Sequence, residues 1–169
     1  MTETQVDART RTYSWADPSV PAAHVAGMSG LELFAAMESG ALPRPPIMDT
    51  LGVDRLTATG EGTVTVYLQP AEFHYNPLGT MHGGVISTLL DTAAACAVHT
   101  TLPAGMAYTS LDLTVRFLKP ITTGSGLLRC EGIVVSRGRS TALGEAKLYD
   151  AAGRLVAHGT STCMIFPAR

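Results

Sequence analysis

The sequence has few charged residues and no long uncharged apolar run. Only 15% of its 169 residues are charged and the formal net charge is -2, so it lacks the positive surface expected of a nucleic-acid-binding protein. No stretch reaches the ~20 apolar residues that cross a bilayer, and residues 1–7 show neither the basic nor the apolar region of a secretion signal. We therefore expect a cytoplasmic protein that binds neither nucleic acid nor a membrane.

Metal-ligand spacings are also lacking. The three cysteines, Cys96, Cys130 and Cys163, lie far apart in apolar sequence and form no Cys-x-x-Cys pair. The five histidines show no His-Glu-x-x-His or comparable spacing. The sequence thus predicts reduced cysteines and no metal site.

What the sequence does contain divides into an N-terminal extension, residues 1–49, and a domain, residues 50–169. Within the extension, Ser29 and Glu32 have the spacing of a capping box, and the apolar residues that follow predict a short helix ending at Gly40. Three prolines at positions 43, 45 and 46 then predict an extended connector, because each fixes φ and lacks an N–H.

The domain predicts one long helix between two groups of strands. A hairpin is expected over 53–59 and 62–68, and four strands in an antiparallel meander over 108–118, 127–136, 140–149 and 154–166. The segment between them, 85–98, is apolar on nearly every face, so it has to be covered by the sheet or by a partner. The expected fold class is α+β, with a curved antiparallel sheet wrapped around one long central helix.

The most informative segment joins the hairpin to this helix. His82-Gly83-Gly84 opens the helix, so unpaired N–H groups and the positive end of the helix dipole face whatever lies in front of Gly83. An oxyanion is one such ligand. Asp91 follows two turns later among apolar residues, where a carboxylate is costly unless it is paired or used.

Together, Asn76, His82-Gly83-Gly84, Asp91 and the strands that follow resemble a hotdog-fold acyl-CoA thioesterase of the PaaI type, within the 4-hydroxybenzoyl-CoA thioesterase-like superfamily. The resemblance covers about residues 50–166, including Ser110 to Phe117 and the turn Ser136 to Ser140. It implies hydrolysis of an acyl-CoA thioester to a carboxylic acid and free coenzyme A, without metal or cofactor. It further implies a homodimer with its sites at the interface, and a dimer of dimers.

The resemblance also assigns the two principal roles. The N–H of Gly83 would donate to the thioester carbonyl as charge builds on oxygen. Asp91 would act as the general base for water or as a direct nucleophile, and the sequence does not separate these two routes. Each residue also has a purely structural explanation. Gly83 could be required only because the tight turn has no space for a side chain, and the carboxylate of Asp91 could be capped by the hydroxyl of Thr88 or Thr92.

Three further residues complete the predicted catalytic set. Asn76 would donate a second hydrogen bond to the carbonyl or hold the water, and His82 would orient the loop or donate towards the departing sulfur. Each of these two residues also has a purely structural explanation. Asn76 could form an Asx turn with the residues that follow it, and His82 could be a loop histidine hydrogen-bonded to backbone. Ser110 matches a position where family members place a water-orienting hydroxyl.

Coenzyme A carries phosphates, and basic residues are their expected partners. Arg137-Gly138-Arg139-Ser140 offers two guanidinium groups on a flexible turn, and Lys119 is a further candidate. Regular strand alternation predicts Arg116 on the same face as Ser110. The small residues Ala93, Ala94 and Ala95 are expected to leave room for an acyl group beside Asp91.

Two other functions remain compatible with this pattern. A hotdog hydratase or dehydratase would use an aspartate and a histidine for proton transfer on the acyl chain. A non-catalytic acyl-CoA-binding module would use the same pocket without turnover.

Overall fold

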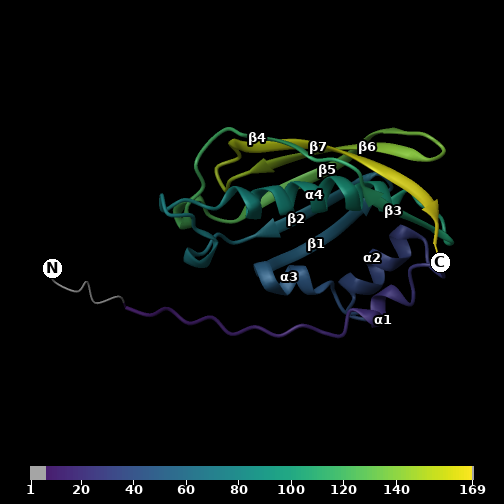
Figure 1. The fold of residues 1–169 in the computed structure, drawn as a ribbon, viewed down its shortest axis with the longest axis horizontal. Coiled ribbons are helices and arrows are strands. Elements are labelled where there is room, and N and C mark those ends of the chain that lie inside the picture. Colours follow the sequence, from purple (N-terminus) through teal and green to yellow (C-terminus); the bar gives the residue numbers. More distant parts are fainter. Residues whose placement is uncertain (1–6, 169) are drawn as a thin grey trace.

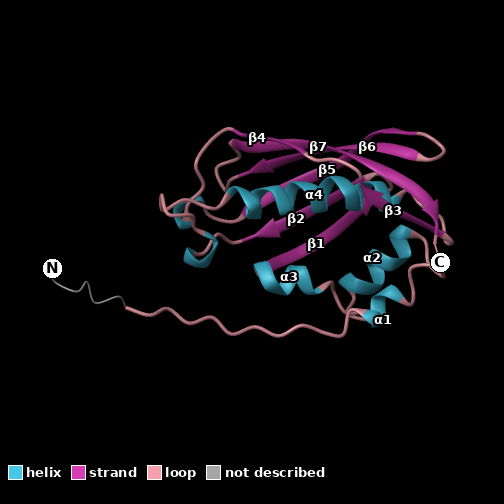
Figure 2. Cartoon of the chain, viewed as in Figure 1, coloured by secondary structure: helices cyan, strands magenta, loops and turns pink. Residues whose placement is uncertain are grey.

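The computed structural model describes residues 7–168, and their strands form one curved antiparallel sheet around a single long helix (Figures 1 and 2). The sheet order is β1-β2-β5-β6-β7-β3, and β4 also pairs with β7. The strands are β1 (Val53–Gly60), β2 (Thr63–Leu68), β3 (Met106–Ser110), β4 (Thr114–Phe117), β5 (Leu128–Arg137), β6 (Thr141–Tyr149) and β7 (Leu155–Pro167). The helices are α1 (Ser19–Ala22), α2 (Gly30–Glu38), α3 (Pro46–Leu51) and α4 (Gly83–Thr100), with short 3-10 turns at Glu72–His74 and Thr123–Ser125. The predicted α+β arrangement is confirmed.

The central helix α4 is buried against the concave face of the sheet. Alternate residues of β2 and β6 point towards it, as the period of two requires: Val64, Val66, Leu68, Ala146 and Leu148 are each at most 1% exposed. Leu90, Ala93 and Ala94 face them from the helix and are fully buried. Within residues 7–168, no helix combines the length and the apolar character needed to cross a bilayer.

Two sheet glycines let the helix backbone lie directly on the strands. A Cβ on Gly132 would lie 2.0 Å from the carbonyl oxygen of Ala93, and one on Gly144 would lie 2.6 Å from that of Ala94. Ala93 and Ala94 lie at these contacts and are fully buried against the sheet. The expectation that they leave room beside Asp91 is wrong for these two residues.

The predicted strand 108–118 is also wrong, because it is broken in the middle. The carboxylate of Asp112 accepts the N–H of Thr162 (3.0 Å) and its carbonyl accepts the hydroxyl of Ser161 (2.8 Å). The chain thus forms β3 and β4, which both pair with β7. The last strand of the chain therefore lies beside the first strand after the helix, and the order is not a simple meander.

This break also reverses a predicted face. Between the pairs Ser110–Cys163 and Thr114–Thr160, the β3–β4 segment advances four residues while β7 advances three. A one-residue slip moves the following side chains to the opposite face. Ser110 shares the face of buried Cys163, whereas Arg116 pairs with His158 on the other face, which contradicts the prediction that Arg116 and Ser110 share one.

The N-terminal segment packs on the rest of the domain through α2. Its capping box is confirmed, since the side chains of Ser29 and Glu32 exchange hydrogen bonds with each other's N–H groups. The N–H of Gly30 donates to the carbonyl of Leu102 (3.0 Å), and a Cβ at Gly30 would lie 1.8 Å from the carbonyl oxygen of His99. The start of α2 is therefore in backbone contact with the end of α4.

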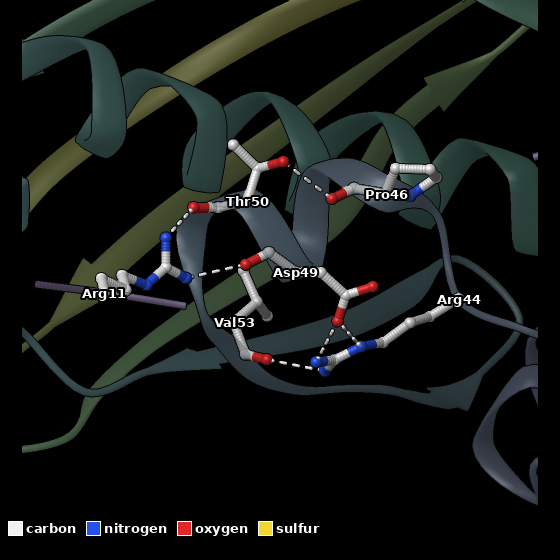
Figure 3. A network of polar contacts seen from close by, with 6 residues as sticks. All are labelled: Arg11, Arg44, Pro46, Asp49, Thr50 and Val53. Atoms are coloured by element: carbon white, nitrogen blue, oxygen red, sulfur yellow. Dashed lines mark hydrogen bonds and ion pairs between the residues drawn. The ribbon is translucent and has the colours of Figure 1, made fainter. Parts of the chain in front are cut away.

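The proline connector is extended only as far as Pro45. Pro46 instead begins α3, where its fixed φ suits the first turn of a helix, so α3 spans the predicted boundary at residues 49 and 50. Figure 3 shows how this helix is held: the guanidinium of Arg44 binds the carboxylate of Asp49 and the carbonyl of Val53 (both 2.8 Å). Arg11 donates to the carbonyls of Thr50 (2.6 Å) and Asp49 (2.8 Å). Arg11 thus fastens the segment before α1 to α3, and Arg44 fastens the connector to α3 and to the start of β1.

Candidate active site

The carboxylate of Asp91 has one protein partner, the hydroxyl of Ser110 at the end of β3. The Ser110 hydroxyl donates to Asp91 Oδ1 at 2.9 Å, and we find no other donor to this carboxylate within residues 7–168. Thr88, considered as a cap, donates to the carbonyl of Gly84 instead. Asp91 is half-buried, so part of its side chain remains accessible. It is a carboxylate held at one oxygen, with the other available to a ligand.

Asp91 and Ser110 line a cavity of about 860 Å³. Its floor is one face of α4, with Thr92, Ala95, Cys96 and His99 following Asp91. Burial raises the pKa of the Cys96 thiol to about 12 and lowers the pKa of His99 to about 4. Near neutral pH, Cys96 is therefore a protonated thiol and His99 a neutral imidazole, and Asp91 is the one carboxyl group on this helix face.

The sequence did not single out His99 as part of this surface. The signal was present, because residues 91, 95 and 99 recur every four positions and so share one helix face. It was hidden by the apolar character of the whole segment.

The predicted loop forms the N-terminus of α4 as expected. His82 is the N-cap residue, and its Nδ1 accepts the N–H of Gly84 at 2.9 Å. An accepting Nδ1 places the ring proton of the neutral imidazole on Nε2, where it is available as a donor. The N–H of Gly83 has no acceptor among residues 7–168. The loop therefore presents a free backbone donor at the positive end of the helix dipole.

Asn76 shapes the loop through its side chain. Its amide oxygen accepts the N–H groups of Leu78 (2.9 Å) and Thr80 (3.3 Å), and its amide nitrogen donates to the hydroxyl of Thr80 (3.1 Å). The bond to Leu78 is the Asx turn that was the structural alternative. One amide hydrogen of Asn76 remains beyond these contacts, so its role as a donor to substrate stays a prediction.

Gly83 and Asn76 line a second cavity, of about 490 Å³, which Asp91 does not reach. Gly83 and Asp91 are eight residues apart on α4, which corresponds to about 12 Å along the helix axis. A carbonyl under attack has to lie within hydrogen-bond distance of its donor and close to the attacking group. Within one chain, these two groups lie in different cavities.

The predicted phosphate contacts are likewise divided. Lys119 lines the second cavity beside Gly83. The exposed turn Arg137 to Ser140 lies on the far side of β7 and β6 from Ser110, since Ser110, Cys163, Ala142 and Arg137 occupy one row of the sheet. Three strand spacings, about 14 Å, separate the ends of that row. A single chain does not bring Lys119 and the arginine turn together beside Ser110.

Comparisons with known proteins place this geometry in a family. The family model described as thioesterase superfamily matches residues 78–157, a segment that holds His82, Gly83, Asp91 and Ser110. A phenylacetic acid degradation-related protein of Ralstonia eutropha is 32% identical, with 78% of this chain and 98% of that protein covered and a TM-score of 0.70. The chain belongs to the thioesterase superfamily.

One curated relative supports the thioesterase assignment, and a second solved structure supports the fold. Acyl-coenzyme A thioesterase 13 of Homo sapiens is 29% identical over 113 residues, which cover 66% of this chain and 79% of the relative. The PaaI protein of the E. coli phenylacetic acid degradation operon has a TM-score of 0.71 over 85% of this chain and 97% of its own length. At 21% identity, that likeness shows the fold alone. The hotdog fold and the PaaI-like thioesterase family are confirmed, and with them the reaction class of thioester hydrolysis.

Proposed function

We propose that this thioesterase hydrolyses acyl-CoA thioesters at sites that each combine two copies of the chain. The observation that carries the proposal is that the predicted catalytic groups of one chain lie in two separate cavities. The free N–H of Gly83, at the N-terminus of α4, lies in one cavity, and Asp91 with Ser110 lies in the other. A twofold dimer presents each half to the complementary half of its partner. The similarity to acyl-coenzyme A thioesterase 13 supports the coenzyme A ester as substrate.

In the proposed reaction, the thioester carbonyl oxygen lies in front of the Gly83 N–H. As the carbonyl carbon is attacked, negative charge moves onto this oxygen, where a preorganised donor contributes about 3 kcal/mol. The helix dipole of α4 has the same sign at that point and adds to the stabilisation.

Asp91 of the partner subunit supplies the attack. As a general base it removes a proton from water, whose oxygen bonds to the carbonyl carbon; as a nucleophile it bonds directly and forms an anhydride that water then opens. In both routes the carbon–sulfur bond breaks and the thiolate leaves with a proton. Ser110 holds one oxygen of Asp91 in place, which orients the other oxygen.

His82 and the basic residues would serve the leaving group. The Nε2–H of His82, fixed by the Gly84 contact to Nδ1, is a candidate proton donor to sulfur. Lys119 and the turn Arg137-Gly138-Arg139-Ser140 are the proposed partners of the coenzyme A phosphates. The outer edge of β3 at the end of the sheet is the proposed dimer contact, and a dimer of dimers is the proposed assembly.

The direct test is a thiol-release assay of the purified protein on acetyl-, hexanoyl-, decanoyl-, palmitoyl- and phenylacetyl-CoA. We expect release from at least one ester in proportion to enzyme concentration, with the free acid as co-product. A folded protein that binds these esters and releases no thiol would contradict the proposal and favour a binding module. Hydration of an enoyl-CoA without thiol release would favour the hydratase alternative.

A further inference from the structure

The cavity that holds Asp91 is closed on one side by the N-terminal segment. It is lined opposite the floor formed by α4 by Pro21 of α1, Val25 just after α1, Phe34 and Met37 of α2, and Ile47 of α3. All five side chains are apolar, and none lies within the segment matched by the family model. The structure therefore adds a wall to the site that the segment matched by the family model does not supply.

The cavity runs along the helix away from the reacting carboxylate. Asp91, Ala95 and His99 all line it, and residues 91 and 99 are two turns apart, about 12 Å along the axis. His99 closes the far end: its ring lies edge-on to Phe34 with centroids 5.4 Å apart, and 4.9 Å from the ring of Tyr108. Phe34 and His99 are each only 7% exposed, so this end is firmly packed.

The chemistry of a thioester decides which part of it occupies this space. The carbonyl carbon beside Asp91 carries two substituents, the sulfur of coenzyme A and the acyl tail. The phosphates of coenzyme A are too costly to desolvate against these five apolar side chains. Two guanidinium groups also line the cavity, but Arg44 is bound to Asp49 and the carbonyl of Val53, and exposed Arg55 lies over the ring of Tyr67. The acyl tail is the substituent that gains from burial there.

We propose that the acyl tail extends from Asp91 towards His99 beneath α2, and that the N-terminal segment selects medium-length to long acyl chains through Met37 and Phe34. This inference rests on the proposed function and adds its specificity element. The cavity volume, about 860 Å³, suits a drug-sized apolar group and leaves an acetyl group largely without contacts. Each methylene buried along it raises kcat/KM by about fourfold until the tail reaches His99.

The test compares kcat/KM across acetyl-, hexanoyl-, decanoyl- and palmitoyl-CoA for the wild type and three α2 variants. Met37→Trp fills the middle of the cavity and should lower kcat/KM for decanoyl-CoA by at least about tenfold while acetyl-CoA changes less than about twofold. Phe34→Ala opens the far end and should shift the preference towards palmitoyl-CoA. Leu31→Ala is the matched control, because Leu31 is on the same helix, is 37% exposed and does not line the cavity.

A second readout separates this inference from the proposed function. Calorimetric binding of a non-hydrolysable decanoyl-CoA thioether needs no turnover, and Met37→Trp should weaken it by the same factor. Equal changes for every chain length, or no change in binding, in variants that melt cooperatively like the wild type would overturn the role of α2. Absence of thiol release from the wild type, with binding still dependent on Met37, would overturn only the hydrolysis proposal.

Discussion

Replacing Asp91 with asparagine should lower kcat for thioester hydrolysis by about 10²–10⁴-fold, because the amide neither removes a proton from water nor attacks the carbonyl. The substitution keeps the shape of the side chain, and its amide oxygen still accepts the Ser110 hydroxyl. Substrate binding should therefore change little. The measurement is steady-state thiol release on the best ester from the panel, beside thermal melting of both proteins.

Glu38→Gln is the matched control for Asp91→Asn. Glu38 lines the same cavity from α2, so Glu38→Gln also removes one carboxylate from the cavity wall. Glu38 is exposed and makes no hydrogen bond to Ser110. We expect this variant to retain activity within about twofold. Near-normal turnover in Asp91→Asn, or equal losses in the two variants, would refute the role of Asp91 in the reaction.

Gly83→Pro should lower kcat by about 10²–10³-fold, the range seen when one oxyanion donor is removed. The position suits proline: Gly83 is the first residue of α4, where the N–H is not used by the helix, and His82 already has the extended ψ of 138° that a residue before proline needs. The substitution therefore removes the donor while the helix start is retained. Thiol release and circular dichroism measure the two effects separately.

A Gly83→Ala variant separates the effect of losing the N–H from the effect of adding side-chain atoms at this position. Both variants place a Cβ about 3.1 Å from the ring of Phe117, so both require the same small movement of that ring. Only proline lacks the N–H. Activity that falls equally in the two variants would show that the glycine is needed for space and not as a donor.

The features predicted correctly from the sequence are those encoded by near neighbours in the chain. The helix start at the glycine pair, where His82 accepts the N–H of Gly84, and the capping box of Ser29 and Glu32 are both local. Such contacts span two or three residues, so the residue types alone specify them. The apolar character of α4 likewise indicated that the sheet or a partner covers it. The family resemblance pointed to Asp91 and Ser110 separately, and the structure places their side chains in contact.

The features that were missed depend on contacts distant in sequence. The break between β3 and β4 is fixed by bonds from Asp112 to Ser161 and Thr162, about fifty positions away, and no local pattern signals them. The N-terminal segment was predicted only as an extension with a short helix, because its apolar residues indicate that they pack but not against what. Its position beside Asp91 depends on the packing of α2 against the end of α4, a contact between segments far apart in the sequence.

The most direct test of the shared site is the activity of mixed dimers formed from Asp91→Asn and Gly83→Pro chains, each inactive alone. If each site takes Gly83 from one chain and Asp91 from the other, one of the two sites in a mixed dimer carries both substitutions and the other carries neither. Differently tagged chains, co-expressed and purified through both tags, should then recover about half of the wild-type activity per dimer. Activity that stays at the level of the single variants would contradict the account, because it would show that each chain builds its site from its own Gly83 and Asp91.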